Sequence, residues 1–282
     1  MEKRKEEIMK FVFLLAACAS IATVAMICLF LFANGLPTIG KIGAADFFLG
    51  ERWRPANDVY GILPMILGSL YVTLGAIVVG VPVGILTAVF MARFCPEKIY
   101  NVLKPSVELL AGIPSVVYGF FGLVVMVPFI REHIGGSSML TASLLLGMMI
   151  LPTLISVAEA ALRAVPDSYY EGALALGAGH VRSVFFTVVP AAKSGIMAAI
   201  ILGMGRAVGE TMAVIMVAGN QARMPIGILE GVRTMTTNIV IEMGYAADLH
   251  RDALIATAVV LFVFILIINL TFSYLKGKVV QQ

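Results

Sequence analysis

Long apolar runs alternate with short polar stretches along the whole chain. Each run is long enough to cross a bilayer, because a spanning helix needs about 20 predominantly apolar residues. The first run follows a basic N-terminal stretch, but it is longer than the roughly 7–15 apolar residues of a signal peptide and so predicts an uncleaved anchor. The pattern therefore predicts six transmembrane helices, over residues 11–33, 67–91, 107–130, 139–162, 195–218 and 253–274.

Composition agrees with this pattern. Hydrophobic residues make up 60% of the 282 residues and charged residues 13%, and the mean hydropathy is +0.98, which is too apolar for a soluble domain of this length. With the N-terminus inside, more Lys and Arg fall in the segments that would be cytoplasmic than in the longer external segments. We therefore expect an all-α, multi-pass protein of the cytoplasmic (inner) membrane with both termini cytoplasmic.

The fifth run carries an arginine and a glutamate near its middle, Arg206 and Glu210. A charged arginine at the centre of a spanning helix costs about 3 kcal/mol, so it is normally kept only where it pairs or lines a polar path. Four residues are about one helical turn, which predicts that the two side chains project from one face and pair. Because a guanidinium suits a tetrahedral oxyanion, the pair is a candidate substrate path or gate. The alternative is a fixed salt bridge that joins two helices.

The third run contains a backbone break. Gly112 and Pro114 interrupt it near its start, and such breaks are tolerated where the backbone faces protein or a polar cavity. If the path runs there, Ser115 and Tyr118 are its predicted polar lining. A plain proline kink is the alternative.

The loop between the fourth and fifth runs, at about 163–193, predicts two short helices. An S-x-x-E capping box at 168–171 predicts the start of the first helix. Gly177 and Gly179 interrupt that helix, and residues 181–188 resume it until Pro190. The apolar side of this hairpin has to be covered either by the helical bundle or by a partner. The loop is thus either an ordinary interfacial hairpin or a docking element.

The remaining polar residues predict neither a catalytic nor a metal centre. Glu159 and Arg163, an i,i+4 pair at the end of the fourth run, are expected to form a solvated helix cap. The histidines His133, His180 and His250 lie in different loops without ligand spacing, so no metal site and no cofactor are predicted. The sequence contains neither G-x-x-x-x-G-K-[ST] nor H-E-x-x-H, so no phosphate-loop ATPase site is predicted in this chain and an intramembrane enzyme is disfavoured.

The cytoplasmic loop resembles the EAA loop of the permease subunits of ABC importers. Gly172 stands where that family usually has a second alanine, and Thr187 where it has an aliphatic residue. The resemblance implies that the loop is a coupling helix that sits in a groove of the ATPase subunit. The residues that match the family's spacing are Glu171, Ala173, Gly177 and Pro190.

Three further segments, 108–123, 203–214 and 237–244, are similar to the permeases of the high-affinity phosphate importer. The GETMAV stretch at 209–214 is more similar to the PstC-type permease than to its PstA-type partner. The resemblance covers about residues 61–275 and implies a type I ABC importer permease (MetI-like) fold. It also implies three kinds of partner: a second, PstA-like permease, cytoplasmic ATPase subunits and an extracytoplasmic phosphate-binding protein.

We therefore expect two parts in the chain. Residues 1–60 form an anchor helix and the first external loop, and residues 61–282 form the permease core. The predicted function is transport of inorganic phosphate across the cytoplasmic membrane. A permease for another oxyanion, such as sulfate or molybdate, is the alternative, and an ATPase-independent carrier or channel has no reason to carry an EAA-like loop.

Overall fold

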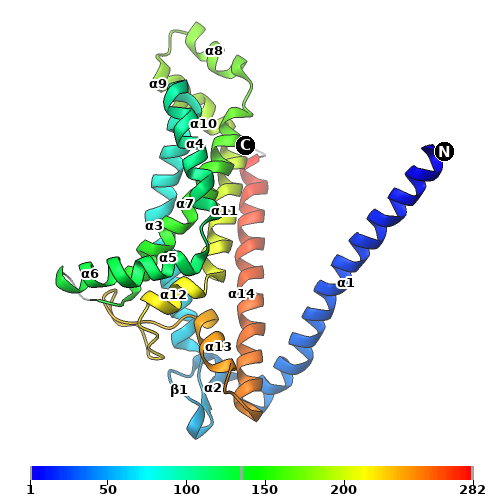
Figure 1. Cartoon of the computed structure of the whole chain (residues 1–282), viewed down its shortest axis with the longest axis vertical. Coiled ribbons are helices and arrows are strands. Elements are labelled where there is room, and N and C mark those ends of the chain that lie inside the picture. The colour runs from blue at the N-terminus through cyan, green and yellow to red at the C-terminus, as the bar shows by residue number, and fades with distance from the viewer. Residues whose placement is uncertain (1, 134–135, 281–282) are drawn as a thin grey trace.

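Four long helices run side by side and form the centre of the protein (Figure 1). The computed structural model describes residues 2–133 and 136–280. The main contact is between the second and fourth predicted spans, and small residues let them approach closely, as in other membrane bundles. A Cβ atom on Gly80 would lie 2.9 Å from the carbonyl oxygen of Gly147. The four helices are α3 (Leu63–Val89), α7 (Met139–Arg163), α11 (Lys193–Gly209) and α14 (Asp248–Val280).

The N-terminal helix α1 (Glu2–Ile42) leaves the bundle as an arm (Figure 1). Its later part packs on α14, where a Cβ on Gly35 would lie 2.6 Å from Val259 Cγ2. Most of its apolar side chains between Ile8 and Phe30 are exposed. In a bilayer these side chains face lipid or another membrane protein, since neither surrounding requires burial within the chain itself.

The third predicted span, 107–130, is not one helix. The chain forms α4 (Glu97–Gly112) along the bundle, breaks at Ile113 and Pro114, and then crosses the bundle as α5 and α6 (Figure 1). The apolar helix long enough to span is therefore Ser115–Glu132. The physical reason is that Pro114 lacks an N–H group and holds the residue before it in an extended conformation. This stretch comprises α5 (Ser115–Phe121), the π-helical turn η3 (Gly122–Met126) and α6 (Val127–His133).

The fifth predicted span, 195–218, is also interrupted. Helix α11 ends at Gly209, the backbone of Glu210 is extended, and α12 (Met212–Val217) follows. Within residues 2–133 and 136–280, five helices are long and apolar enough to cross a membrane. The number is six if the segment His180–Ala191 and α11, which meet at 69°, count as one span. The all-α membrane architecture is thus as predicted, with two broken spans.

The loop at 163–193, which the sequence predicts to be cytoplasmic, lies at one end of the bundle and contains two short helical segments (Figure 1). Its first helix begins at Asp167 after Pro166 and has no side-chain cap, so the predicted capping box at 168–171 is wrong. The second segment continues through Pro190 instead of ending there, because proline is tolerated in the first turn of a helix. The elements are α8 (Asp167–Ala175), α9 (His180–Ser183), the π-helical turn η4 (Val184–Val188) and α10 (Val189–Ala191).

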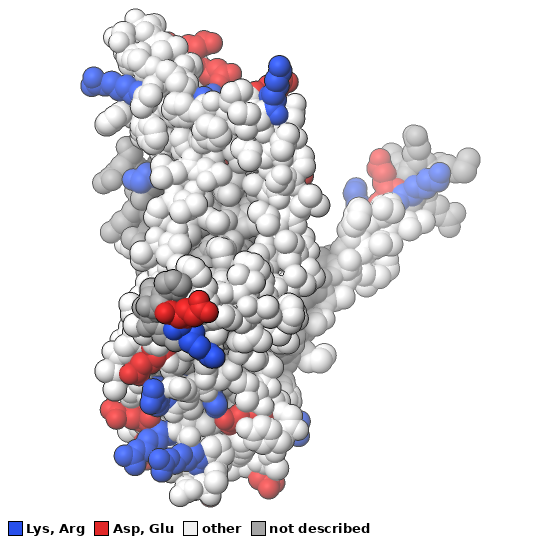
Figure 2. All heavy atoms as spheres, turned by 60° about the vertical axis from the view of Figure 1, so that its left-hand side comes forward, with Lys and Arg blue, Asp and Glu red and all other residues white. Residues whose placement is uncertain are grey.

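The opposite end carries a small folded cap. A two-stranded antiparallel sheet pairs Trp53 with Tyr60 and packs beside α13 and the start of α14. Charged side chains gather toward the two ends of the molecule, with a broad uncharged band between them (Figure 2). That distribution fits a chain whose middle lies in hydrocarbon. The cap comprises α2 (Ala44–Leu49), β1 (Trp53–Arg54), the 3₁₀ turn η1 (Pro55–Asn57), β2 (Val59–Tyr60) and α13 (Met235–Met243).

Candidate functional site

Arg206 lies in the last turn of α11 and is half-buried. Its Nη1 atom donates a hydrogen bond to Thr153 Oγ1 of α7 at 3.2 Å. Among the residues that the structure describes, none of the ion pairs involves Arg206. The arginine is also close enough to Tyr118 for its charge to act on that side chain. A guanidinium has five donors, so most of them remain available here.

Glu210 is not the partner of Arg206, and the predicted ion pair is wrong. Its Oε1 atom instead accepts hydrogen bonds from the backbone N–H groups of Thr211 at 3.1 Å and Ala213 at 3.2 Å. The carboxylate therefore satisfies free amides at the start of α12. The reason is geometric: α11 ends at Gly209, so the two residues no longer lie one turn apart on one helix.

The two broken spans cross next to their breaks. A Cβ atom on Gly119 of α5 would lie 2.7 Å from Met216 Sδ and 2.8 Å from Ala213 Cα of α12, so only glycine allows this approach. The hydroxyl of Tyr118 donates to the carbonyl oxygen of Leu110 at 2.9 Å and thus bridges the break between α4 and α5. The structure brings Tyr118 and Arg206 into one region, and it places Ser115, half-buried, at the first turn of α5.

One side of α11 near Arg206 has no neighbour in the described part of the chain. Gly205 and Gly209 stand in a GxxxG spacing, and no atom lies within 4 Å of a Cβ built on either residue. Small residues at this spacing usually allow close helix contact in membranes. The surface beside Arg206 is therefore open in this chain.

The four EAA-matching residues lie in the loop at 163–193. Glu171 is exposed and Ala173 half-buried on α8, and Pro190 lies in α10. Gly177 ends α8 with a φ of +87°, a left-handed conformation that favours glycine, and its N–H bonds to the carbonyl of Leu174 at 2.8 Å.

Large apolar side chains project from this loop without cover. Leu176 is 92% exposed and Phe186 is 77% exposed, and Tyr169 and Val181 are also exposed. An exposed apolar patch of this kind on a polar end of the molecule indicates an interaction surface.

Glu159 is the centre of a buried ionic cluster, so the predicted solvated cap is wrong. Only 2% of its side chain is exposed. Its carboxylate accepts hydrogen bonds from Lys104 Nζ at 2.7 Å, from the Tyr100 hydroxyl at 3.0 Å and from Arg163 Nε. Arg163 also lies over the Tyr100 ring and donates to the carbonyl oxygen of Met91. Because α4 covers the end of α7, the i,i+4 pair of Glu159 and Arg163 is part of a buried ionic cluster that joins α4 to α7.

A second buried glutamate, Glu242, lies in the cap at the other end of the bundle, and the sequence did not predict it. Glu242 accepts from Arg233 Nη1 at 2.6 Å and from Trp53 Nε1 at 2.7 Å, and its Oε2 atom lies 2.8 Å from His250 Nε2. Tyr60 stacks on the imidazole ring. No local pattern could have found this cluster, because Trp53 and Glu242 are 189 residues apart.

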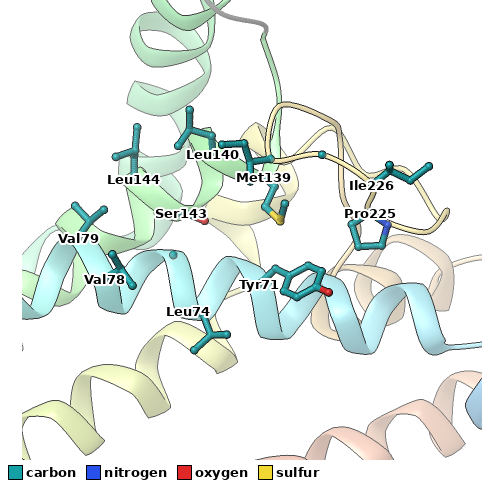
Figure 3. Close-up of a pocket in the computed structure, with 13 residues that line it drawn as sticks. Tyr71, Leu74, Val78, Val79, Met139, Leu140, Ser143, Leu144, Pro225 and Ile226 are labelled. Atoms are coloured by element: carbon teal, nitrogen blue, oxygen red, sulfur yellow. The ribbon is translucent and has the colours of Figure 1, made fainter.

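A pocket of about 510 Å³ lies between α3, α7 and the loop that carries Pro225 and Ile226 (Figure 3). Its walls are mostly apolar and carry no charged side chain, and the labelled side chains include Tyr71, Leu74 and Met139. None of the predicted site residues lines it. An apolar pocket without a charged group is not a site for an inorganic anion.

Comparison with known proteins agrees with this architecture. The family described as "Binding-protein-dependent transport system inner membrane component" matches residues 80–281. The chain is 37% identical to the probable ABC transporter permease protein YqgH of Bacillus subtilis, over 94% of this chain and 89% of that protein. It is 31% identical to the phosphate transport system permease protein PstC of Mesorhizobium japonicum, over 88% of this chain and 83% of that protein.

Solved structures show the same fold at lower sequence identity. A chain of the bacterial alginate ABC transporter, solved in complex with a pentasaccharide-bound periplasmic protein, aligns with a TM-score of 0.66, 15% identity and 97% coverage of both chains. A chain of the MetNI methionine ABC transporter aligns with a TM-score of 0.64 and 20% identity, over 81% of this chain and 99% of that chain. The predicted ABC importer permease fold is thereby confirmed. With its broken spans and its EAA-like loop, the chain belongs to the family of binding-protein-dependent transport system inner membrane components.

Proposed function

We propose that this chain is the permease subunit through which an ABC importer moves inorganic phosphate across the cytoplasmic membrane. Relatives named as phosphate transport system permeases support the choice of anion, among them PstC of Mesorhizobium japonicum at 31% identity and a probable PstC of Methanocaldococcus jannaschii at 30%. The chain has no activity of its own in this proposal. ATP hydrolysis is supplied by separate cytoplasmic subunits.

The observation that carries the proposal is the free charge of Arg206. From the start of α11 at Lys193, a rise of about 1.5 Å per residue places Arg206 roughly 20 Å along the helix, well inside the bilayer. Its hydrogen-bond partner Thr153 is neutral, whereas Glu210 is engaged by the amides of α12. An anion in the path can therefore bind the guanidinium without displacing a carboxylate. Tyr118, and Ser115 one turn before it, supply further polar groups on α5.

The arrangement of the two ends supports the proposed partners. The exposed apolar side chains of the cytoplasmic loop offer a surface to an ATPase subunit, and the folded cap at the opposite end is available to an extracytoplasmic phosphate-binding protein. The open side of α11 at Gly205 and Gly209 suits a second, PstA-like permease, which would close the path around Arg206. Helix α1 begins and α14 ends toward the end of the molecule where the loop with α8 lies (Figure 1). If that loop is cytoplasmic, both termini are cytoplasmic as well.

The proposal is tested by phosphate uptake into proteoliposomes that contain the assembled importer. We expect ATP-dependent uptake, competed weakly by sulfate and molybdate, and a loss of at least tenfold in Arg206→Gln, because a hydrogen bond to a charged group contributes about 1.5–3 kcal/mol. Arg206→Lys keeps the charge and should retain part of the activity. Lys10→Gln, which removes an exposed positive charge from the part of α1 that leaves the bundle, is the control.

Assembly is checked by pull-down of the ATPase subunit in each variant. Normal uptake by an assembled Arg206→Gln importer would show that Arg206 does not act in the transport path. Preferential uptake of sulfate or molybdate would replace phosphate by that anion, and uptake without ATP would point to an independent carrier or channel.

A further inference from the structure

Helix α3 ends in a wide turn next to the cytoplasmic loop. After Val89 the chain forms the π-helical turn η2 (Phe90–Phe94), which is closed by a hydrogen bond of 2.8 Å from Cys95 N to the carbonyl oxygen of Phe90. Such turns are rare and often occur at functional positions. In this turn two consecutive residues, Arg93 and Phe94, both contact the loop.

Arg93 joins α3 to the junction at which α7 ends and α8 begins. Its Nη1 atom binds Asp167 Oδ1 at 3.0 Å, and its Nη2 atom donates to the carbonyl oxygens of Leu162 at 3.0 Å and Val165 at 3.3 Å. Carbonyls at the end of a helix lack partners within the helix and attract positive charge. The guanidinium thus satisfies the end of α7 and the first residue of α8 together, and only 13% of the side chain is exposed.

Phe94 contacts the second half of the loop. Its ring centroid lies 4.6 Å from that of His180, the first residue of α9, and 6.3 Å from that of Phe185. The imidazole Nδ1 of His180 is in turn 2.7 Å from the Tyr170 hydroxyl on α8. One turn of α3 therefore contacts both halves of the loop.

The two halves are joined by the Tyr170–His180 contact and by a chain segment that has room to bend. They meet at Gly177 and Gly179, and no atom lies within 4 Å of a Cβ built on either glycine. Leu176 and Phe186 are exposed on either side of these glycines, so force from a partner that covers them would act on a hinged segment. A hinged loop transmits movement only if each half is attached to a rigid element.

Helix α3 is that rigid element, and it reaches the external cap. A Cβ atom on Gly68, near its start, would lie 2.5 Å from the carbonyl oxygen of Arg233. Ser69 Oγ accepts a hydrogen bond of 2.9 Å from the N–H of Met235 at the start of α13. Along its length α3 packs on α7 more extensively than any other pair of helices in the described residues. The helix thus connects the cytoplasmic loop to the cap at the opposite end.

We propose that Arg93 and Phe94 are the positioning residues that couple movement of the cytoplasmic loop to α3, with Arg93 as the principal one. This inference rests on the proposed function only in that an ATPase subunit acts on the loop. It does not depend on which anion is carried. In the absence of the Arg93 bonds, the loop still docks on its partner, but its movement is no longer transmitted to the spans.

The test measures the ratio of anion imported to ATP hydrolysed by the assembled importer in proteoliposomes. In Arg93→Gln we expect this ratio to fall at least tenfold, with the ATPase subunit still bound in a pull-down. Arg93→Lys should recover part of the ratio, since an ammonium keeps the charge but cannot bind Asp167 and two carbonyls as a planar fork does. Asp167→Asn should lower it less than twofold, because that carboxylate is 77% exposed and the carbonyl bonds remain.

Lys98→Gln is the matched control, because it removes an exposed positive charge from the same end of the molecule. An assembled Arg93→Gln importer whose ratio stays within twofold of the unsubstituted protein would overturn the proposal. If that variant does not assemble, Arg93→Lys and Phe94→Leu decide by the same ratio: a normal ratio in both overturns the proposal, and a reduced ratio supports it. Import of another anion by the unsubstituted importer would revise the proposed function and leave this ratio fully measurable.

Discussion

Glu159 and Arg206 are both charged groups set into the helical bundle, and their surroundings differ in kind. Glu159 is almost fully buried and is bound by two cations and a phenol from α4 and α7. Arg206 is half-buried, has a neutral hydroxyl as its partner, and stands beside an open side of α11. One site is therefore closed within the chain, and the other still has donors to offer.

The difference separates two uses of charge in a membrane protein. A glutamate whose oxygens are all occupied joins helices and has no capacity left for a mobile ion, as at Glu159 and again at Glu242 in the external cap. An arginine with unused donors is costly to keep in a bilayer unless something else binds it. Substitutions at the closed sites, Glu159 and Glu242, should therefore lower stability. Substitutions at the open site around Arg206 should lower transport.

The largest effect is expected for Glu159→Gln. The substitution leaves Lys104 and Arg163 without their negative partner, and breaking a buried ion pair costs about 3–5 kcal/mol. Because both cations are partly exposed, we expect about 3 kcal/mol, measured as a lower unfolding temperature of the purified protein in detergent. Glu97→Gln, an exposed glutamate at the start of the same α4, should leave that temperature unchanged. An equal temperature for both variants would show that the cluster does not hold the helices.

A smaller effect, on transport alone, is expected for Thr153→Val. This change has nearly the same volume and removes the hydroxyl that holds Arg206, a hydrogen bond to a charged group that contributes about 1.5 kcal/mol. Uptake at limiting substrate should fall roughly tenfold, by the same conversion of free energy to rate. The control is Thr87→Val, since that hydroxyl bonds to the carbonyl of Val83 in its own helix α3. Unchanged uptake by Thr153→Val would mean that Arg206 needs no support from α7.

The role of Glu210 is decided by Glu210→Ala. Loss of a helix cap costs about 1 kcal/mol of unfolding free energy, whereas an arginine left unpaired in the bilayer would cost about 3 kcal/mol. A double-mutant cycle with Arg206→Gln sharpens the distinction, because residues that share no contact add within about 0.5 kcal/mol. Strong coupling between the two substitutions would instead show that Glu210 and Arg206 form an ion pair, which the structure does not contain.

The sequence predicted what local pattern controls. Apolar runs revealed the spans, Gly112 and Pro114 revealed the first break, and the two glycines at 177 and 179 revealed where the loop helices are interrupted; the coupling role of that loop stays a prediction. The second break escaped prediction because no proline marks it and the apolar run continues from Gly195 to Ala218. It is stabilised by a local cap, in which the Glu210 carboxylate accepts from the amides of Thr211 and Ala213, and by one tertiary contact, in which the Glu210 carbonyl accepts from Thr236.

The same limit explains the residues that were missed. Thr153 is an ordinary threonine in an apolar helix until α11 packs against it, and Arg93 is one of several basic residues at a cytoplasmic helix end. For Glu159, the i,i+4 pattern correctly predicted a bond to Arg163 but gave no sign that α4 would cover it with Lys104 and Tyr100. Contacts between helices far apart in sequence leave no periodic trace.

The smallest expected effect concerns the pH dependence of the Glu159 cluster. The hydrogen bond to Glu159 raises the pKa of Lys104 above its ordinary 10.5. A raised pKa in the folded state means that the stabilisation is complete below pH 10.5 and is lost as the pH rises through the higher folded value. We expect less than about 1 kcal/mol from this lysine because it is partly exposed. The difference in unfolding temperature between the unsubstituted protein and Lys104→Gln should therefore stay constant from pH 6 to 9, within this window. A difference that already shrinks below pH 9 would show that Lys104 is not held by Glu159. The Glu159 site would then not be closed within the chain, and its contrast with Arg206 would fail.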